Sequence, residues 1–86
     1  MAKLITAAER LVRARALIQQ ARDYPVPTDD AGKYDLSYIA QVKDLLRQAR
    51  DLVKFIPQSA GASTDVKADA HAVLQEADQA NQDILH

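Results

Sequence analysis

Residues 36–56 read LSYIAQVKDLLRQARDLVKFI, and this stretch decides the predicted fold. Its apolar residues recur at spacings of three and four, which places them on one face of an α-helix. That face comprises Ile39, Val42, Leu46, Ala49, Val53 and Ile56, and it is widened by Tyr38, Leu45 and Leu52. The opposite face carries Lys43, Asp44, Arg47, Arg50, Asp51 and Lys54. This division predicts an amphipathic helix with one buried side and one solvated side.

Two further helices are predicted on either side of this segment, over about residues 3–23 and 65–85. The buried face of the first comprises Leu4, Ala7, Leu11, Ala14, Ile18 and Ala21. The buried face of the last comprises Val66, Ala70, Val73, Leu74, Ala77, Ala80 and Ile84. Asp35 is expected to cap the helix over 36–56, and Ser63 or Thr64 the helix over 65–85. Prolines after residues 24 and 56 end the first two helices, because proline cannot continue the helical hydrogen bonds.

The predicted fold is all-α: a three-helix antiparallel bundle, up-down-up, forming a single domain over residues 1–86. Its core is thin, because sixteen Ala stand against nine Leu, six Val and five Ile. A chain of this size buries only roughly 60–65% of the surface that it exposes when unfolded. Contact with a second copy or another partner would bury more apolar surface, so we expect a homo-oligomer or a subunit of a larger assembly.

Charge is unevenly divided along the chain. Residues 1–28 hold five basic and two acidic side chains, whereas residues 57–86 hold one basic and five acidic side chains. We therefore expect the first and third helices to be neighbours. Arg15 and Arg22 stand where the spacing of the first helix predicts apolar residues. Either the buried stripe rotates midway, or these arginines flank an interface and reach acids on the third helix or on another chain.

A partner interface is predicted from residues outside the buried stripe of the first helix and from the first loop. The apolar face of residues 36–56 is expected to join this contact. The tyrosines around the first loop either bind a partner or close the end of a thin core, and the second alternative is favoured because tyrosine is amphipathic. The candidate contact residues are Ile5, Val12, Arg15, Arg22, Tyr24, Tyr34 and Tyr38.

A short similarity recurs at intervals of 28 residues. Residues 17–23 match residues 45–51, and more loosely residues 73–79. It is either a degenerate helical repeat or a chance likeness of three similar helices. We favour chance, because this interval is not among the periods of common helical repeats.

Few residues of this chain are of the types that catalyse reactions or bind metals and phosphate. The chain has no Cys, which excludes disulfides and thiolate ligands or nucleophiles, and it has only two His. Gly32-Lys33 lacks the first glycine of a phosphate-binding loop, and the loop over 28–35 lacks the first and last ligands of a calcium loop. Turn formation explains Asp29 and Asp30 better. We predict a non-enzymatic protein with no cofactor, metal or small-molecule substrate.

The leading functional hypothesis is a helical protein–protein interaction module. One alternative is a nucleic-acid-binding accessory protein that uses the basic surface of Lys3, Arg10 and Arg13. The acidic third helix opposes this alternative by removing the net field that attracts polyphosphate. Another alternative is phosphotransfer through His71, which we expect to be solvent-exposed in acidic surroundings. No apolar run approaches the roughly 20 residues of a membrane span, and we expect a cytoplasmic protein.

Overall fold

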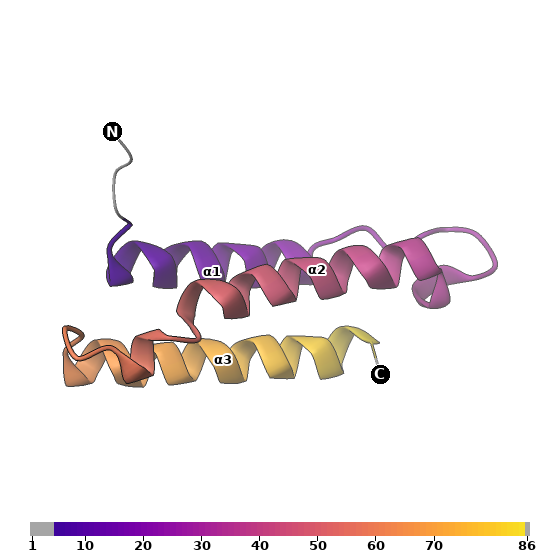
Figure 1. Ribbon diagram of the computed structural model, residues 1–86. Helices are drawn as coiled ribbons and strands as arrows, with labels where there is room; N and C mark the ends of the chain where they lie inside the picture. The colour runs from indigo at the N-terminus through magenta and orange to yellow at the C-terminus, as the bar shows by residue number, and fades with distance from the viewer. Residues whose placement is uncertain (1–4, 86) are drawn as a thin grey trace.

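The computed structural model describes residues 5–85, apart from the side chain of Lys33, and over that range it is built from three α-helices (Figure 1). Helix α1 spans Ala7–Arg22, α2 spans Leu36–Val53 and α3 spans Thr64–Leu85. Short 3₁₀ turns occupy Gly32–Tyr34 and Ile56–Gln58. No strand occurs within the described residues. The predicted all-α fold is confirmed.

The three helices lie side by side, and each contacts both of the others. Figure 1 shows α1 and α3 running in one direction and α2 in the opposite direction, which is the predicted up-down-up order. As a result, the start of α1, the end of α2 and the start of α3 share one end of the bundle. None of the helices in the described range is long and apolar enough to cross a lipid bilayer.

Helix α1 begins at Ala7 rather than at about residue 3, because Thr6 is extended and caps it. The Thr6 hydroxyl accepts a hydrogen bond from the Glu9 backbone N–H at 3.1 Å. This satisfies one of the backbone donors that the first turn of a helix leaves unpaired. The sequence signal was present, since Thr6-Ala7-Ala8-Glu9 has the spacing of a capping box. Leu4 lies outside the described residues.

The cap predicted for α2 is confirmed, but the predicted end of this helix at Ile56 is wrong. The Asp35 carboxylate accepts a hydrogen bond from the Tyr38 N–H at 3.0 Å. The helix stops at Val53, four residues before Pro57, because the proline ring would clash with the carbonyl of Val53 in a continued helix. Ile56 instead opens a 3₁₀ turn and stays buried. Helix α3 begins one residue earlier than predicted, with the Ser63 hydroxyl accepting from the Val66 N–H at 3.2 Å.

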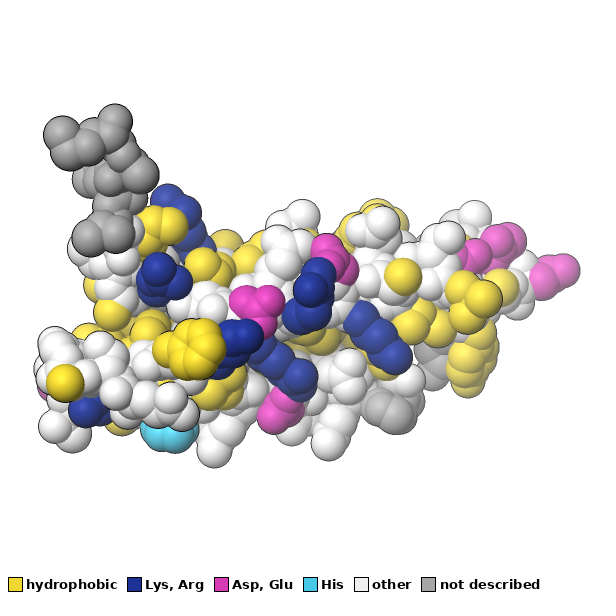
Figure 2. Space-filling view, in the orientation of Figure 1, with side chains coloured by type: hydrophobic (Ala, Val, Ile, Leu, Met, Phe, Trp, Pro, Cys, Tyr) yellow, Lys and Arg dark blue, Asp and Glu magenta, His cyan; other side chains and the backbone are white. Residues whose placement is uncertain are grey.

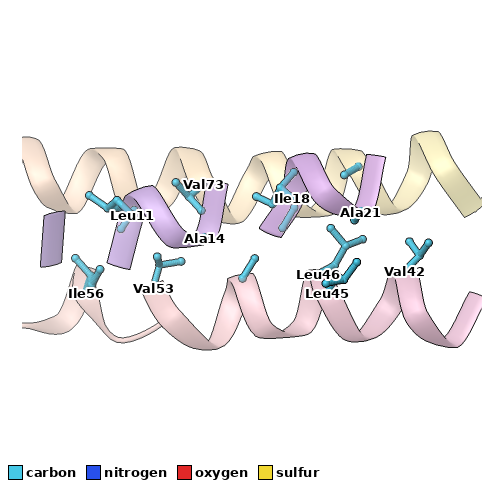
Figure 3. Close-up of a cluster of buried hydrophobic side chains, with 14 of the residues drawn as sticks. Leu11, Ala14, Ile18, Ala21, Val42, Leu45, Leu46, Val53, Ile56 and Val73 are labelled. Atoms are coloured by element: carbon cyan, nitrogen blue, oxygen red, sulfur yellow. The ribbon is translucent and has the colours of Figure 1, made fainter. Parts of the chain in front are cut away.

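The core runs the length of the bundle between the three helices, where the labelled side chains point toward one another (Figure 3). Most of the large buried side chains come from α2, as its apolar periodicity predicts. Alanines complete the core where the helices approach each other, and six of them are fully buried: Ala14, Ala21, Ala49, Ala70, Ala77 and Ala80. The half-buried apolar residues around this core include Ile39, Leu52, Val66, Leu74 and Ile84.

Candidate functional site

Two arginines of α1 bind acids of α3, which resolves the question that the sequence left open. Arg15 donates to both oxygens of Asp69, at 2.6 and 3.0 Å, and its Nε donates to Glu76 at 3.2 Å. Arg22 donates to Asp83 at 3.1 Å. Both arginines therefore flank the contact between α1 and α3 within one chain. The prediction that α1 and α3 are neighbours is confirmed. The two guanidinium groups are already paired with acids of their own chain.

These contacts shift the ionisation of the groups that form them. The hydrogen bonds from Arg15 lower the pKa of the Asp69 carboxyl below its usual value, and the same contact raises the pKa of the guanidinium. Hydrogen bonds from Gln79 and Arg22 lower the pKa of Asp83. The paired side chains remain about two-fifths exposed, so solvent screens the pairs and each contributes little. They orient α3 on α1 more than they stabilise it.

We expect the contribution of Asp69 to stability to be lost in acid. A carboxyl whose pKa is lower in the folded chain than in the unfolded chain stabilises the fold fully above the unfolded value, 3.8, and stops doing so as the pH falls through the folded value. The measurement is the thermal midpoint of the parent chain and of Asp69→Asn at roughly pH 6 and pH 2. The parent should be more stable near pH 6, and the two chains should converge near pH 2. A difference that stays constant with pH would contradict this account.

Most of the apolar face of α2, which the sequence suggested as part of a partner contact, is buried inside the chain itself. Val42 and Val53 are completely buried within the chain, and Tyr38 is only 5% exposed. The Tyr38 ring lies 6.0 Å from the Tyr24 ring, tilted by 50°, so these two tyrosines close one end of the core. This packing of the pair is what the alternative favoured for the tyrosines predicts. Tyr34, in contrast, is largely exposed.

Val12 does face solvent, and a groove lies beside it. Its side chain is 69% exposed, whereas Ile5 is half-buried. The groove runs between the first halves of α1 and α3 and has a volume of about 690 Å³. Small side chains on both helices keep it open. We call this feature the Val12 groove, and it is lined by Ala8, Leu11, Val12, Arg15, Asp65, Val66, Ala68, Asp69 and Ala72.

A second concavity lies on the other side of the first half of α1, next to an exposed aromatic ring. Phe55 is the only phenylalanine of the chain, yet it is 68% exposed, with the Lys54 ammonium 5.2 Å from its ring centre. The concavity has a volume of about 330 Å³. We call it the Phe55 hollow, and it is lined by Ala7, Arg10, Asp51, Leu52, Phe55, Ile56, Ser59 and Ala62.

Sequence reasoning missed Phe55 because it extended α2 through Ile56. The turn after Val53 redirects the chain, so Ile56 is buried while the neighbouring ring is left in solvent. The sequence did hold a signal of this exposure. The phenylalanine follows a lysine of the solvated face and lies close to the proline that ends the helix. Ala7 and Arg10 line the Phe55 hollow, whereas Val12 lines the groove, so α1 presents its first half to both concavities.

The predicted basic surface is divided. Arg10 is half-buried and lines the Phe55 hollow together with Asp51, while Arg13 is exposed beside Val12. Lys3 lies outside the described residues. Figure 2 shows basic and acidic side chains mixed along the face over α2, rather than a continuous basic stripe.

His71 and Asp29 are placed as the sequence suggested. His71 is exposed on α3. Among the described residues, no group of three His, Asp or Glu side chains is arranged to hold a metal ion. The Asp29 carboxylate accepts hydrogen bonds from the backbone N–H groups of Ala31 and Gly32, at 3.1 and 3.2 Å. Its role is therefore to build the turn before Gly32, whose φ of +51° suits glycine.

Comparison with protein-family models, with curated proteins and with solved structures finds no match to this chain. Its own fold and surface therefore define its class. It is an all-α bundle of three helices with a groove and a hollow on either side of the first half of α1. Each concavity has one large, exposed apolar side chain at its edge.

Proposed function

We propose that this chain is a helical interaction module that binds another protein through the surface around the first half of α1. The observation that carries the proposal is the pairing of two exposed side chains, Val12 and Phe55, with a concavity beside each. Apolar surface gathered in one region and rimmed by charged residues is typical of binding sites. Aromatic side chains are also frequent among the residues that dominate binding free energy.

The free energies of side-chain burial and of association indicate how much of this surface a partner must cover. Complete burial of one Val or Phe side chain contributes about 1.5–3 kcal/mol, so burying the exposed two-thirds of Val12 and of Phe55 contributes about 1–2 kcal/mol each. Association costs at least about 4 kcal/mol in lost translational and rotational freedom. Two side chains do not offset that cost. The partner must also fill the Val12 groove, whose alanines allow a helix to approach closely.

A binding role is favoured over catalysis by what lines the two concavities. Most of the lining side chains are apolar, and three of the charged ones, Arg15, Asp69 and Asp51, are occupied in ion pairs. A surface of this kind suits helix-on-helix recognition, in which apolar side chains three and four residues apart enter a groove. A cytoplasmic location is part of the same proposal and rests on the cysteine-free composition.

Site-specific photo-crosslinking in the producing cells tests this function. A benzophenone amino acid is placed at position 12 or 55, and, as a control, at position 43, where Lys43 is exposed on the far face of α2. We expect discrete adducts from positions 12 and 55 that position 43 does not give, and the adduct mass identifies the partner. If positions 12 and 55 give no adduct, or only those that position 43 also gives, the proposed function is wrong.

A further inference from the structure

We infer that the Val12 groove binds a second copy of this chain, in a two-fold dimer whose axis passes near Val12. This inference rests on the proposed function and names the partner for the part of the surface at Val12. Two-fold dimers use the same patch on both copies, so the patch must be complementary to itself in shape and in charge. The surface around Val12 meets both requirements.

Its shape combines a ridge and a groove on adjoining sides of one helix. Val12 projects from α1 between the Val12 groove and a shallower depression lined by Ala8, Glu9 and Arg13. When two copies meet with their α1 helices antiparallel, each Val12 enters the groove of the other copy. Ala68 and Ala72 on α3 leave room for the incoming helix.

Its charges are complementary in the same arrangement. Arg13, on the ridge, and Asp65, in the groove, are both exposed, and neither forms an ion pair within the described part of the chain. Asp65 lines the same groove as Val12 and lies one helical turn before Asp69, the partner of Arg15. In the inferred dimer, the antiparallel α1 of the second copy lies along the groove with its Arg13 facing Asp65. The pairing occurs twice, once on each side of the axis.

The overall charge and the size of the surface set the expected strength. The net charge of the chain is only −1, so two copies do not repel each other strongly. Helix α1 has 16 residues and is therefore about 24 Å long, which limits the contact to the small end of specific interfaces. We expect a dissociation constant on the order of micromolar.

Sedimentation equilibrium of the purified full chain, from about 1 μM to 1 mM, tests the dimer. Val12→Asp, Arg13→Asp and Asp65→Arg should each raise the dissociation constant about tenfold or more. The exchange Arg13→Asp/Asp65→Arg should restore it to within about threefold, because it reverses both charges of each pair. Lys43→Asp is the matched control on the far face of α2 and should leave it unchanged. Circular dichroism checks that every variant keeps its helix content.

The outcomes separate this inference from the proposed function. A chain that stays monomeric up to 1 mM, while position 12 crosslinks to a different protein, overturns the dimer and leaves the proposed function standing. If Val12→Asp leaves the dissociation constant unchanged, or if the charge exchange does not restore it, the placement of the interface at Val12 is wrong. If positions 12 and 55 give no specific crosslink to any protein, the proposed function falls together with the dimer.

Discussion

Val53→Asp is expected to unfold the chain. Val53 is the last residue of α2 and is completely buried, in the same core cluster as Leu11 and Ile56 (Figure 3). An unpaired carboxylate in such a place costs several kcal/mol, and the lost burial of the valine side chain adds about 1.5–3 kcal/mol. A chain of 86 residues has a total free energy of unfolding of only about 4–13 kcal/mol. The substitution therefore removes most or all of the stability.

Thermal unfolding followed by far-ultraviolet circular dichroism measures this effect. The variant should lose most of its helical signal near 25 °C and show no cooperative transition. Val12→Asp makes the same chemical change at an exposed position, so it should keep the helical signal and a cooperative transition even though it weakens the dimer. A cooperative transition in Val53→Asp within about 1 kcal/mol of the parent would show that this position is not buried.

The strong amphipathic pattern explains why α2 was predictable. Its apolar spacing names the buried residues, with only Ile39 and Leu52 half-buried, because one face of that helix packs against both neighbours and the other face meets water. The Asp35 cap was predictable for a similar reason, since its hydrogen bond is local and depends on only a few residues. The uneven distribution of charge along the chain predicted that α1 and α3 are neighbours, and the ion pairs of Arg15 and Arg22 confirm it.

The candidate site was less predictable because it depends on which edges the other helices leave uncovered. Leu17 and Val12 both lie outside the main apolar stripe of α1, yet Leu17 is half-buried against the core and Val12 is exposed. Periodicity within one helix treats them alike. The position of the neighbouring helices distinguishes them, and so does the turn at Ile56, which leaves Phe55 in solvent. The sequence pattern therefore identified Val12 as a candidate and missed Phe55.

Ala77→Leu is expected to lower the free energy of unfolding by about 1–3 kcal/mol, because close packing of α3 depends on alanine. Of the four buried residues of α3, three are Ala70, Ala77 and Ala80, and the fourth is Val73. Ala77 is completely buried, so a larger side chain must push the helices apart. That displacement also strains the nearby pairs of Glu76 with Arg15 and of Asp78 with Arg50. Overpacking outweighs the extra apolar surface that leucine would bury.

Urea denaturation measures the change, with Ala40→Leu as the matched control at an exposed position of α2. The control should stay within about 0.5 kcal/mol of the parent, since both residues favour helix and no neighbour is displaced. Hydrogen exchange adds a test of location, because strain on α3 should speed exchange of its amides more than those of α2. If Ala77→Leu instead stabilises the chain, α3 is not packed closely on the other two helices. Alanine would then fill a loose contact rather than allow a tight one.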